Sequence, residues 1–178
     1  GSTKITKVDF DNKKISSSLN DYDYDKLLIA TGSTNRHLMI DGKTIFPKEN
    51  IIYLRNFEES NNLKNKINKA NNIVIIGGGF IGLEIASSSS QKGKNITILE
   101  KGDQLMGRVI PAEIASLIQE KHEAVGTKIH LKADIEKIKK NNNLYEIYHN
   151  NQILSSDLII IGVGSLPKSL KIWRDVLT

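Results

Sequence analysis

The sequence contains no cysteine among its 178 residues, and only 3 prolines and 1 tryptophan. The absence of cysteine excludes a disulfide framework, a thiolate metal site and a redox-active dithiol within these residues, although it does not fix the cellular compartment. No apolar run approaches the about 18 residues that a membrane-spanning helix needs, so we expect no membrane segment in this chain. The tryptophan and the 5 tyrosines are scattered, so no stacking platform for nucleic acid is visible.

Positive charge exceeds negative charge, and the formal net charge is +5. Of the 25 basic residues 21 are lysine, and several of them are interleaved with asparagine, as in residues 61–72. A surface that binds phosphates usually recruits arginine, so this pattern favours a compositional bias and argues against nucleic acid as a partner. The 4 histidines lack metal-ligand spacing, so we expect no metal site and interpret His122 as a packing residue of a helix.

Hydrophobic residues make up 39% of the chain, which is enough for a globular core. Continuous apolar runs predict strands buried on both faces at residues 73–76, 96–99 and 158–161. Helical periodicity predicts helices at residues 58–69, 80–92 and 111–126. Short alternating segments between residues 129 and 148 predict strands with one exposed face. This order predicts an α/β fold class, a Rossmann-like parallel sheet with a short antiparallel strand meander.

Three apolar patterns lead to more specific predictions. Residues 4–20 alternate like a strand–turn–strand ribbon. Residues 27–30 then predict a short buried strand that ends in the turn at residues 31–33. In the helix that begins at Pro111, one buried stripe is expected to contain Ile114, Leu117, Ile118 and Val125.

The segment Gly77-Gly78-Gly79-Phe80-Ile81-Gly82 follows the first buried strand and opens a helix. In that context it predicts a dinucleotide-binding loop, whereas an isolated glycine motif would be weak support. Gly77 permits the tight turn, Gly79 lets a pyrophosphate approach the backbone, and Gly82 lets the helix lie close to the strand. The helix N-terminus offers its unpaired N–H groups and the positive end of its dipole to the phosphates.

Glu100 ends the second buried strand, where dinucleotide-binding proteins place an acidic residue. Its carboxylate can accept hydrogen bonds from both hydroxyls of the adenine ribose and would repel a 2′-phosphate. This favours NAD(H) over NADP(H) as the ligand. The neighbouring cation Lys101 would soften that preference.

Further likeness extends over almost the whole chain, in residues 24–33, 53–55, 73–84, 105–108, 111–114 and 162–167. These segments resemble the FAD-dependent pyridine nucleotide-disulfide oxidoreductase superfamily. Within it they are most similar to the ferredoxin-reductase-like branch, which includes putidaredoxin and rubredoxin reductases, monodehydroascorbate reductase and apoptosis-inducing factor. The sequence departs from the family at Lys168, where the family usually has asparagine.

The resemblance implies further site residues. Contacts to NAD are implied for Phe80, Ile81, Lys101, Arg108, Gly162, Val163 and Gly164, and contacts to FAD in the full-length protein for Thr31 and Gly32. Glu84 would lie near the nicotinamide and orient it, as the one residue close to the chemistry. An equally good alternative is that Glu84 lies in the first turn of the helix, where its carboxylate interacts favourably with the helix dipole.

The resemblance also implies a domain organisation. Residues 1–45 and 166–178 would be remnants of an FAD domain, and residues 46–165 an NAD(H)-binding domain inserted in it. The family's first glycine motif, which holds FAD, and its flavin-closing Gly-Asp motif would lie outside residues 1–178. We therefore expect this chain to bind NADH but not FAD, and to be inactive alone.

The implied activity is hydride transfer from NADH to FAD, followed by electron transfer to an iron–sulfur protein, monodehydroascorbate or a similar acceptor. One alternative is a disulfide reductase of the same superfamily. Another is an NADH-sensing protein like apoptosis-inducing factor, with a non-enzymatic partner-binding role. The sequence does not determine the electron acceptor or the oligomeric state. For the compartment it leaves the cytoplasm and the mitochondrion as alternatives.

Overall fold

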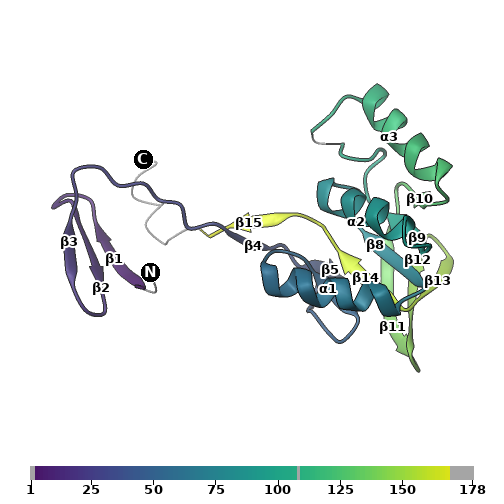
Figure 1. The fold of residues 1–178 in the computed structure, drawn as a ribbon, viewed down its shortest axis with the longest axis horizontal. Coiled ribbons are helices and arrows are strands. Elements are labelled where there is room, and N and C mark those ends of the chain that lie inside the picture. Colours follow the sequence, from purple (N-terminus) through teal and green to yellow (C-terminus); the bar gives the residue numbers. More distant parts are fainter. Residues whose placement is uncertain (1–2, 108, 169–178) are drawn as a thin grey trace. The chain divides into compact units, whose positions relative to one another are not determined.

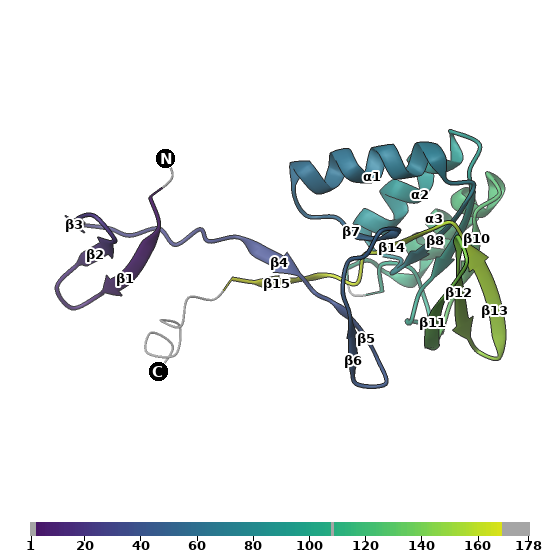
Figure 2. The ribbon, with the colours of Figure 1, turned by 90° about the horizontal axis from the view of Figure 1, so that it is seen from below.

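The structure is a computed structural model that describes residues 3–107 and 109–168. By its internal contacts this part of the chain divides into two compact units. The smaller unit comprises residues 3–34 and 167–168, and the larger unit comprises residues 35–107 and 109–166. Figures 1 and 2 show the elements of each unit in two views. Within the described ranges, no helix is long and apolar enough to cross a membrane.

An antiparallel three-stranded sheet forms most of the smaller unit. Its strands β1 (Ile5–Asp9), β2 (Lys14–Ser17) and β3 (Asp21–Asp23) pair in the order β1-β2-β3. The strand–turn–strand predicted for residues 4–20 is therefore confirmed, with β1 and β2 as its two arms.

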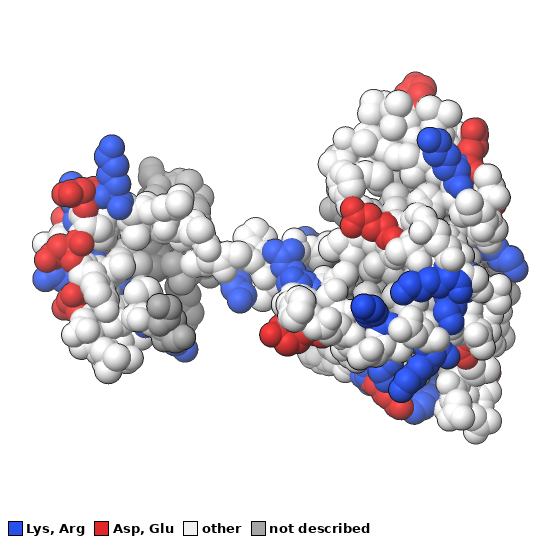
Figure 3. All heavy atoms as spheres, viewed as in Figure 1, with Lys and Arg blue, Asp and Glu red and all other residues white. Residues whose placement is uncertain are grey.

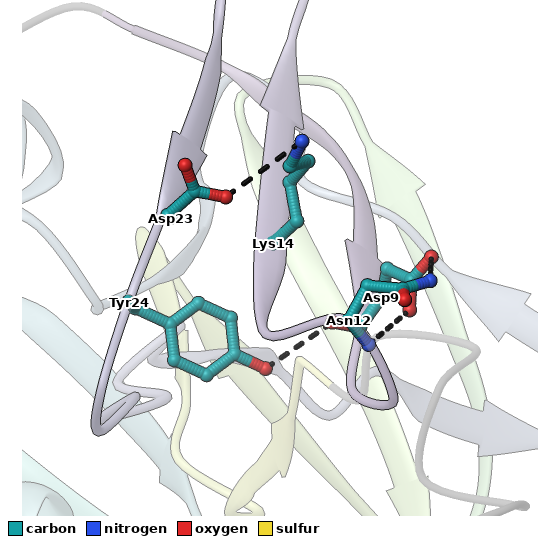
Figure 4. A network of polar contacts seen from close by, with 5 residues as sticks. All are labelled: Asp9, Asn12, Lys14, Asp23 and Tyr24. Atoms are coloured by element: carbon teal, nitrogen blue, oxygen red, sulfur yellow. Dashed lines mark hydrogen bonds and ion pairs between the residues drawn. The ribbon is translucent and has the colours of Figure 1, made fainter.

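Exposed polar contacts fix the geometry of this small sheet (Figure 4). The Asp9 carboxylate accepts hydrogen bonds from the Asn12 backbone N–H at 3.0 Å and from Asn12 Nδ2 at 3.1 Å. These two bonds lower the pKa of Asp9 below its ordinary value. Lys14 Nζ lies 3.7 Å from Asp23 Oδ1, and the Tyr24 hydroxyl donates to the Asp9 carbonyl oxygen at 3.4 Å. Because water competes for such exposed groups, they set the turn more than they stabilise the fold.

The buried strand predicted for residues 27–30 is wrong. These residues pair with no described strand, and the Leu28 side chain is 88% exposed. An apolar run forms a buried strand only where neighbouring strands take its backbone hydrogen bonds and another layer covers its side chains. The turn that follows is held by Lys168, whose carbonyl oxygen accepts from Thr31 Oγ1 at 2.7 Å and whose N–H donates to the Gly32 carbonyl oxygen at 2.9 Å.

A five-stranded parallel sheet forms the centre of the larger unit, which confirms the predicted fold class. Its strands in spatial order are β10 (Lys128–His130), β9 (Asn95–Leu99), β8 (Asn72–Ile76), β14 (Leu158–Ile161) and β7 (Ile51–Tyr53). All four pairings between neighbours are parallel. The helices of this unit are α1 (Phe57–Lys69), α2 (Phe80–Ser90) and α3 (Ala112–Ala124).

Both faces of the parallel sheet are covered (Figures 1 and 2). Helices α1 and α2 lie on one face, and the predicted meander of β11 (Ile135–Asn141), β12 (Leu144–His149) and β13 (Gln152–Ser156) lies on the other. Along β8, Ile73 and Ile75 belong to the apolar cluster on the helix side. The residues that alternate with them, Val74 and Ile76, belong to the cluster on the meander side. Burial on both faces is the physical reason for the continuous apolar runs.

Helix α3 corrects one sequence prediction. Of the expected stripe, Ile118 packs partly against the helix-side core, whereas Ile114, Leu117 and Val125 are 46%, 54% and 61% exposed. Ala115 is the one buried residue of this helix. The helix lies beside the edge strand β10 (Figure 1), so it has a smaller apolar surface to cover than a helix over the middle of the sheet. Periodicity identified the helix correctly but overestimated its burial.

A hairpin near the start of the larger unit shows where the two units divide. Strands β5 (Leu38–Ile40) and β6 (Lys43–Ile45) pair, and Leu38 and Ile45 pack against the meander-side core. The buried Tyr53 hydroxyl donates to the Ile45 carbonyl oxygen and accepts from the Leu38 N–H at 3.1 Å. These contacts place the hairpin in the larger unit, whereas the sequence puts a boundary after residue 45. The short strands β4 (Ser33–Asn35) and β15 (Ser165–Pro167) form a separate pair.

His149, at the end of β12, is an unusual member of the core. It is 1% exposed, and neither ring nitrogen has a hydrogen-bond partner. The ring of His130 lies edge-on to it, with 5.0 Å between centroids. Burial lowers the pKa of His149 most, the nearby His130 lowers it further, and Glu136 opposes both. Folding therefore favours the neutral form of this imidazole.

This buried imidazole predicts a loss of stability in acid. In the unfolded chain His149 binds a proton near its ordinary pKa of 6.5, whereas the folded state binds it only at lower pH. The free energy of unfolding should therefore fall as the pH drops below about 6.5 and through the lowered folded pKa. His149→Leu should remove part of this slope, because leucine is apolar and does not titrate. Urea unfolding from pH 7.5 to about 5 measures it, and equal slopes for both proteins would refute this role.

Candidate functional site

The carboxyl ends of the parallel strands carry the glycines and the acidic residue that the sequence singles out. Gly77 follows β8, Glu100 follows β9, and Gly162 follows β14. The Gly77 N–H donates to the Leu99 carbonyl oxygen at 2.8 Å, and the Gly162 N–H donates to the Ile76 carbonyl oxygen at 2.8 Å. In open α/β sheets this edge is where ligands bind.

Two glycines at this edge are required by the protein's own packing. Gly77 has φ +107°, and a β-carbon added to it would lie 2.5 Å from the Gly162 carbonyl oxygen. A β-carbon on Gly82 would lie 2.1 Å from the Gly77 carbonyl oxygen. Helix α2 therefore crosses the end of β8 at a distance that any larger residue would prevent.

Gly79 differs from these two, because among the described residues no atom apart from its chain neighbours and its own helix's backbone lies within 4 Å of the place its β-carbon would take. It is the N-cap residue of α2, with an ordinary φ of −88°, and within the described part of the chain no side-chain hydrogen bond caps this helix. The first N–H groups of a helix have no partner within it and carry the positive end of its dipole. The open space at Gly79 therefore suits an anionic group that would lie against the backbone.

Glu100 is oriented by two backbone donors. Its Oε2 accepts from the Gly78 N–H at 2.6 Å, and its Oε1 accepts from the Gly102 N–H at 2.7 Å. A β-carbon on Gly78 would lie 2.5 Å from Leu105 Cδ2 and 3.2 Å from Glu100 Oε2, so this glycine is also required. Each carboxylate oxygen keeps a second lone pair for a further donor.

Gly78, Gly102 and Leu105 are residues of the site to which the sequence analysis gave no role. Leu105 is fully buried beside the glycine loop, and the Met106 N–H donates to the Gly78 carbonyl oxygen at 3.0 Å. The sequence signals for these residues were three consecutive glycines and a fourth glycine two residues after Glu100. They could not reveal which glycine meets the carboxylate, because that contact joins two strand ends.

The second glycine segment lies at the same edge. Gly164 has φ +106°, a left-handed conformation that favours glycine, and Val163 packs partly against the meander-side core. The Gly164 carbonyl oxygen accepts from the Arg36 N–H at 3.0 Å. Arg36 is exposed, and its Nε lies 3.9 Å from the place that a β-carbon on Gly164 would take, a proximity that the sequence does not reveal.

Glu84 is exposed on α2, and no acidic residue occupies the first turn of that helix. The placement of Glu84 in the first turn was therefore wrong, because the helix begins at Phe80 and Glu84 is one turn further on. A dipole role weakens beyond the first turn. Phe80 and Ile81, which precede it, are 59% and 39% exposed.

The remaining predicted residues are distributed as follows. Lys101 is exposed and takes part in neither of the two ion pairs found among the described residues. Thr31 and Gly32 belong to the smaller unit. Arg108 lies outside the described residues. Within residues 3–107 and 109–168, no three histidine, cysteine or acidic side chains gather as metal ligands would.

Comparisons with known proteins agree with one another. Residues 1–176 match a family model described as pyridine nucleotide-disulphide oxidoreductase. A rubredoxin-NAD(+) reductase from Ectopseudomonas oleovorans is 33% identical over 169 residues, which cover 93% of this chain and 43% of that protein. A ferredoxin reductase from Rhodopseudomonas palustris matches in structure with a TM-score of 0.82 at 28% identity, over 94% of this chain and 41% of its own.

A further structural match is the covalent complex of putidaredoxin reductase with putidaredoxin. Its TM-score is 0.81 at 25% identity, over 93% of this chain and 41% of that chain. This chain therefore spans less than half the length of each of these relatives.

The contrast between Gly79 and Gly82 gives a matched pair of variants. Gly82→Ala should destabilise the fold by about 1–3 kcal/mol, because the new methyl group meets the Gly77 carbonyl oxygen. Gly79→Ala should change stability by less than about 1 kcal/mol, because its methyl group enters open space and the small capping and entropy effects oppose each other. Urea unfolding of both variants measures the difference. Equal losses would show that the glycine loop is packed differently.

Proposed function

The chain belongs to the pyridine nucleotide-disulphide oxidoreductase family, and we propose that its larger unit binds NADH at the carboxyl edge of the parallel sheet. The observation that carries this proposal is the open space at Gly79, beside the uncapped N-terminus of α2. A pyrophosphate fits there, since it needs close backbone approach and unpaired N–H donors. Bound NADH supplies a hydride for FAD, and the residues of this chain supply position and charge.

Glu100 supports NADH rather than NADPH as the ligand. Its two oxygens are held by the Gly78 and Gly102 N–H groups, so the carboxylate is already oriented before a ligand arrives. The free lone pairs accept the two hydroxyls of the adenine ribose, whereas a 2′-phosphate would meet a negative charge. Lys101 is exposed beside it and reduces this repulsion without replacing the carboxylate.

Glu84 and the second glycine segment fit the other half of the dinucleotide. Glu84 projects from the turn of α2 beyond the phosphate end, and Gly162, Val163 and Gly164 follow β14 at the same edge. We assign Glu84 to the nicotinamide and these three residues to the wall of the site. No general acid or base is needed, because a hydride transfer leaves no proton for the protein to move.

For the whole protein we propose an NADH-dependent flavoprotein that passes electrons from FAD to an acceptor. The likeness to reductases named for rubredoxin and putidaredoxin supports a small iron–sulfur protein as that acceptor. We assign the smaller unit to the flavin domain, with Thr31 and Gly32 against FAD. The exposure of Leu28 supports this, because an apolar run without a partner strand suits a larger sheet.

The charge distribution gives no support to a nucleic-acid partner. In Figure 3 several basic side chains gather on the lower part of the larger unit, with acidic ones at the margin of this group. The basic residues of the chain are almost all lysine, whereas a surface that recognises phosphates usually recruits arginine. The net charge of +5 is therefore consistent with the electron-transfer function and does not favour the non-enzymatic alternative.

This function can be tested by titrating the chain with NADH and with NADPH while the fluorescence of the nucleotide is measured. NADH should bind more tightly. Glu100→Ala should weaken NADH binding about tenfold, since two hydrogen bonds to a charged acceptor are lost, and should reduce the preference over NADPH. Glu113→Ala, which removes an exposed carboxylate from α3, is the charge-matched control. Absence of NADH binding, or tighter NADPH binding, would contradict the proposal.

Glu84 can be tested with ADP-ribose, which lacks the nicotinamide. Glu84→Ala should weaken NADH binding by about three- to tenfold while ADP-ribose affinity stays unchanged, because only the nicotinamide half meets this carboxylate. Isothermal titration with both ligands measures the two affinities. An equal effect on both ligands would assign Glu84 to the adenine half or to the fold instead.

A further inference from the structure

The turn that carries Glu100 is supported by a neighbouring loop, residues 130–134, which we call the brace. The Glu100 N–H donates to the His130 carbonyl oxygen at 2.9 Å, and the Ala133 N–H donates to the Glu100 carbonyl oxygen at 2.9 Å. The Lys132 N–H donates to the Gly102 carbonyl oxygen at 2.8 Å. The brace therefore holds both ends of the turn at residues 100–102, whose first residue carries the carboxylate.

The brace is held in turn by one side chain from the meander. Asn150, in the turn between β12 and β13, donates from Nδ2 to the Lys132 carbonyl oxygen at 3.0 Å. Its Oδ1 accepts from the Asp134 N–H at 3.0 Å, and its own N–H donates to the Asp134 carbonyl oxygen at 3.3 Å. Both polar ends of the Asn150 amide are thus used on the brace.

The brace needs such support because its centre is strained. Lys132 has φ +52°, a left-handed conformation that residues other than glycine adopt at a cost. The Asn150 amide holds the carbonyl oxygen of Lys132 itself, so it opposes relaxation at the strained residue. Relaxation there would turn the Lys132 N–H away from Gly102.

We propose that Asn150 is a positioning residue for nucleotide selectivity, although it lies on the meander and outside the dinucleotide loop. The relay runs from Asn150 through Lys132 to Gly102, whose N–H holds Oε1 of Glu100. Without Asn150 the brace relaxes, the Gly102 N–H loses its alignment, and the carboxylate is no longer fixed toward the ribose hydroxyls. This inference rests on the proposed binding of NADH and adds a determinant to it.

Asn150→Gly tests the relay, with Asn151→Gly as its matched control. Both asparagines are left-handed, with φ of +44° and +61°, so glycine keeps each backbone conformation. Among the described residues, the side chain of Asn151 makes no hydrogen bond, and only its backbone N–H contacts Glu136. The pair therefore separates loss of the amide from the change to glycine.

The measured quantity is the ratio of the dissociation constants for NADPH and NADH. Asn150→Gly should reduce this ratio about three- to tenfold, and Asn151→Gly should leave it unchanged. A partly unfolded variant binds both nucleotides less by the same factor, so the ratio responds only to the ribose end. Reduced nicotinamide mononucleotide, which lacks the adenine ribose, should bind equally well to both variants and the unmodified chain.

A second variant keeps the test sharp if Asn150→Gly folds poorly. Asn150→Asp retains the acceptor for the Asp134 N–H but replaces the donor to Lys132 with an oxygen that repels its carbonyl group, so its ratio should also fall. If either variant had the same ratio of dissociation constants as the unmodified chain, the role of Asn150 would be overturned. That result, with NADH still preferred by the unmodified chain, leaves the proposed function intact. Failure of the unmodified chain to bind NADH removes the function and the inference together.

Discussion

The close contact of backbone at Gly77, Gly82 and Gly162 is the constraint on which the larger unit depends. A β-carbon at Gly77 or Gly82 would lie within 2.5 Å of a neighbouring carbonyl oxygen. Only without those side chains can α2 begin directly over the end of β8 while β14 ends beside it. The same contact places an uncapped helix N-terminus, the acid after β9 and the second glycine segment at one edge of the sheet.

That edge is built mainly from backbone groups. The donors to Glu100 are the N–H groups of Gly78 and Gly102, and the brace reaches the same turn through main-chain bonds. Backbone donors are fixed by the fold and need no rotamer to be frozen when a ligand binds. The parallel sheet, buried on both faces, supplies the rigidity, because each strand end is set by apolar residues in two separate clusters.

The sequence was sufficient where local pattern and tertiary environment agree. The runs at residues 73–76 and 158–161 are buried strands, and the loop between β8 and α2 has the expected turn. The sequence was misleading where burial depends on a neighbour. Leu28 has a strand-like context but no described partner strand, and Leu117 lies on a helix at the sheet edge. Apolar periodicity reports what a segment could cover, and the fold decides whether a surface is there to be covered.

The candidate site divides along the same line. Gly77, Gly82 and Glu100 are visible in the sequence because a missing side chain or a charge is itself the functional feature. Gly102 and Asn150 are not, because what they contribute is the direction of a backbone N–H or the support of a distant carbonyl group. Gly102 contributes a backbone N–H and Asn150 contributes an amide that contacts a distant loop, so the identity of neither residue points to this role in the sequence. The selectivity of such a site therefore depends partly on residues that no dinucleotide motif contains. The contacts around the acidic residue identify those residues, whereas its spacing from the glycines does not.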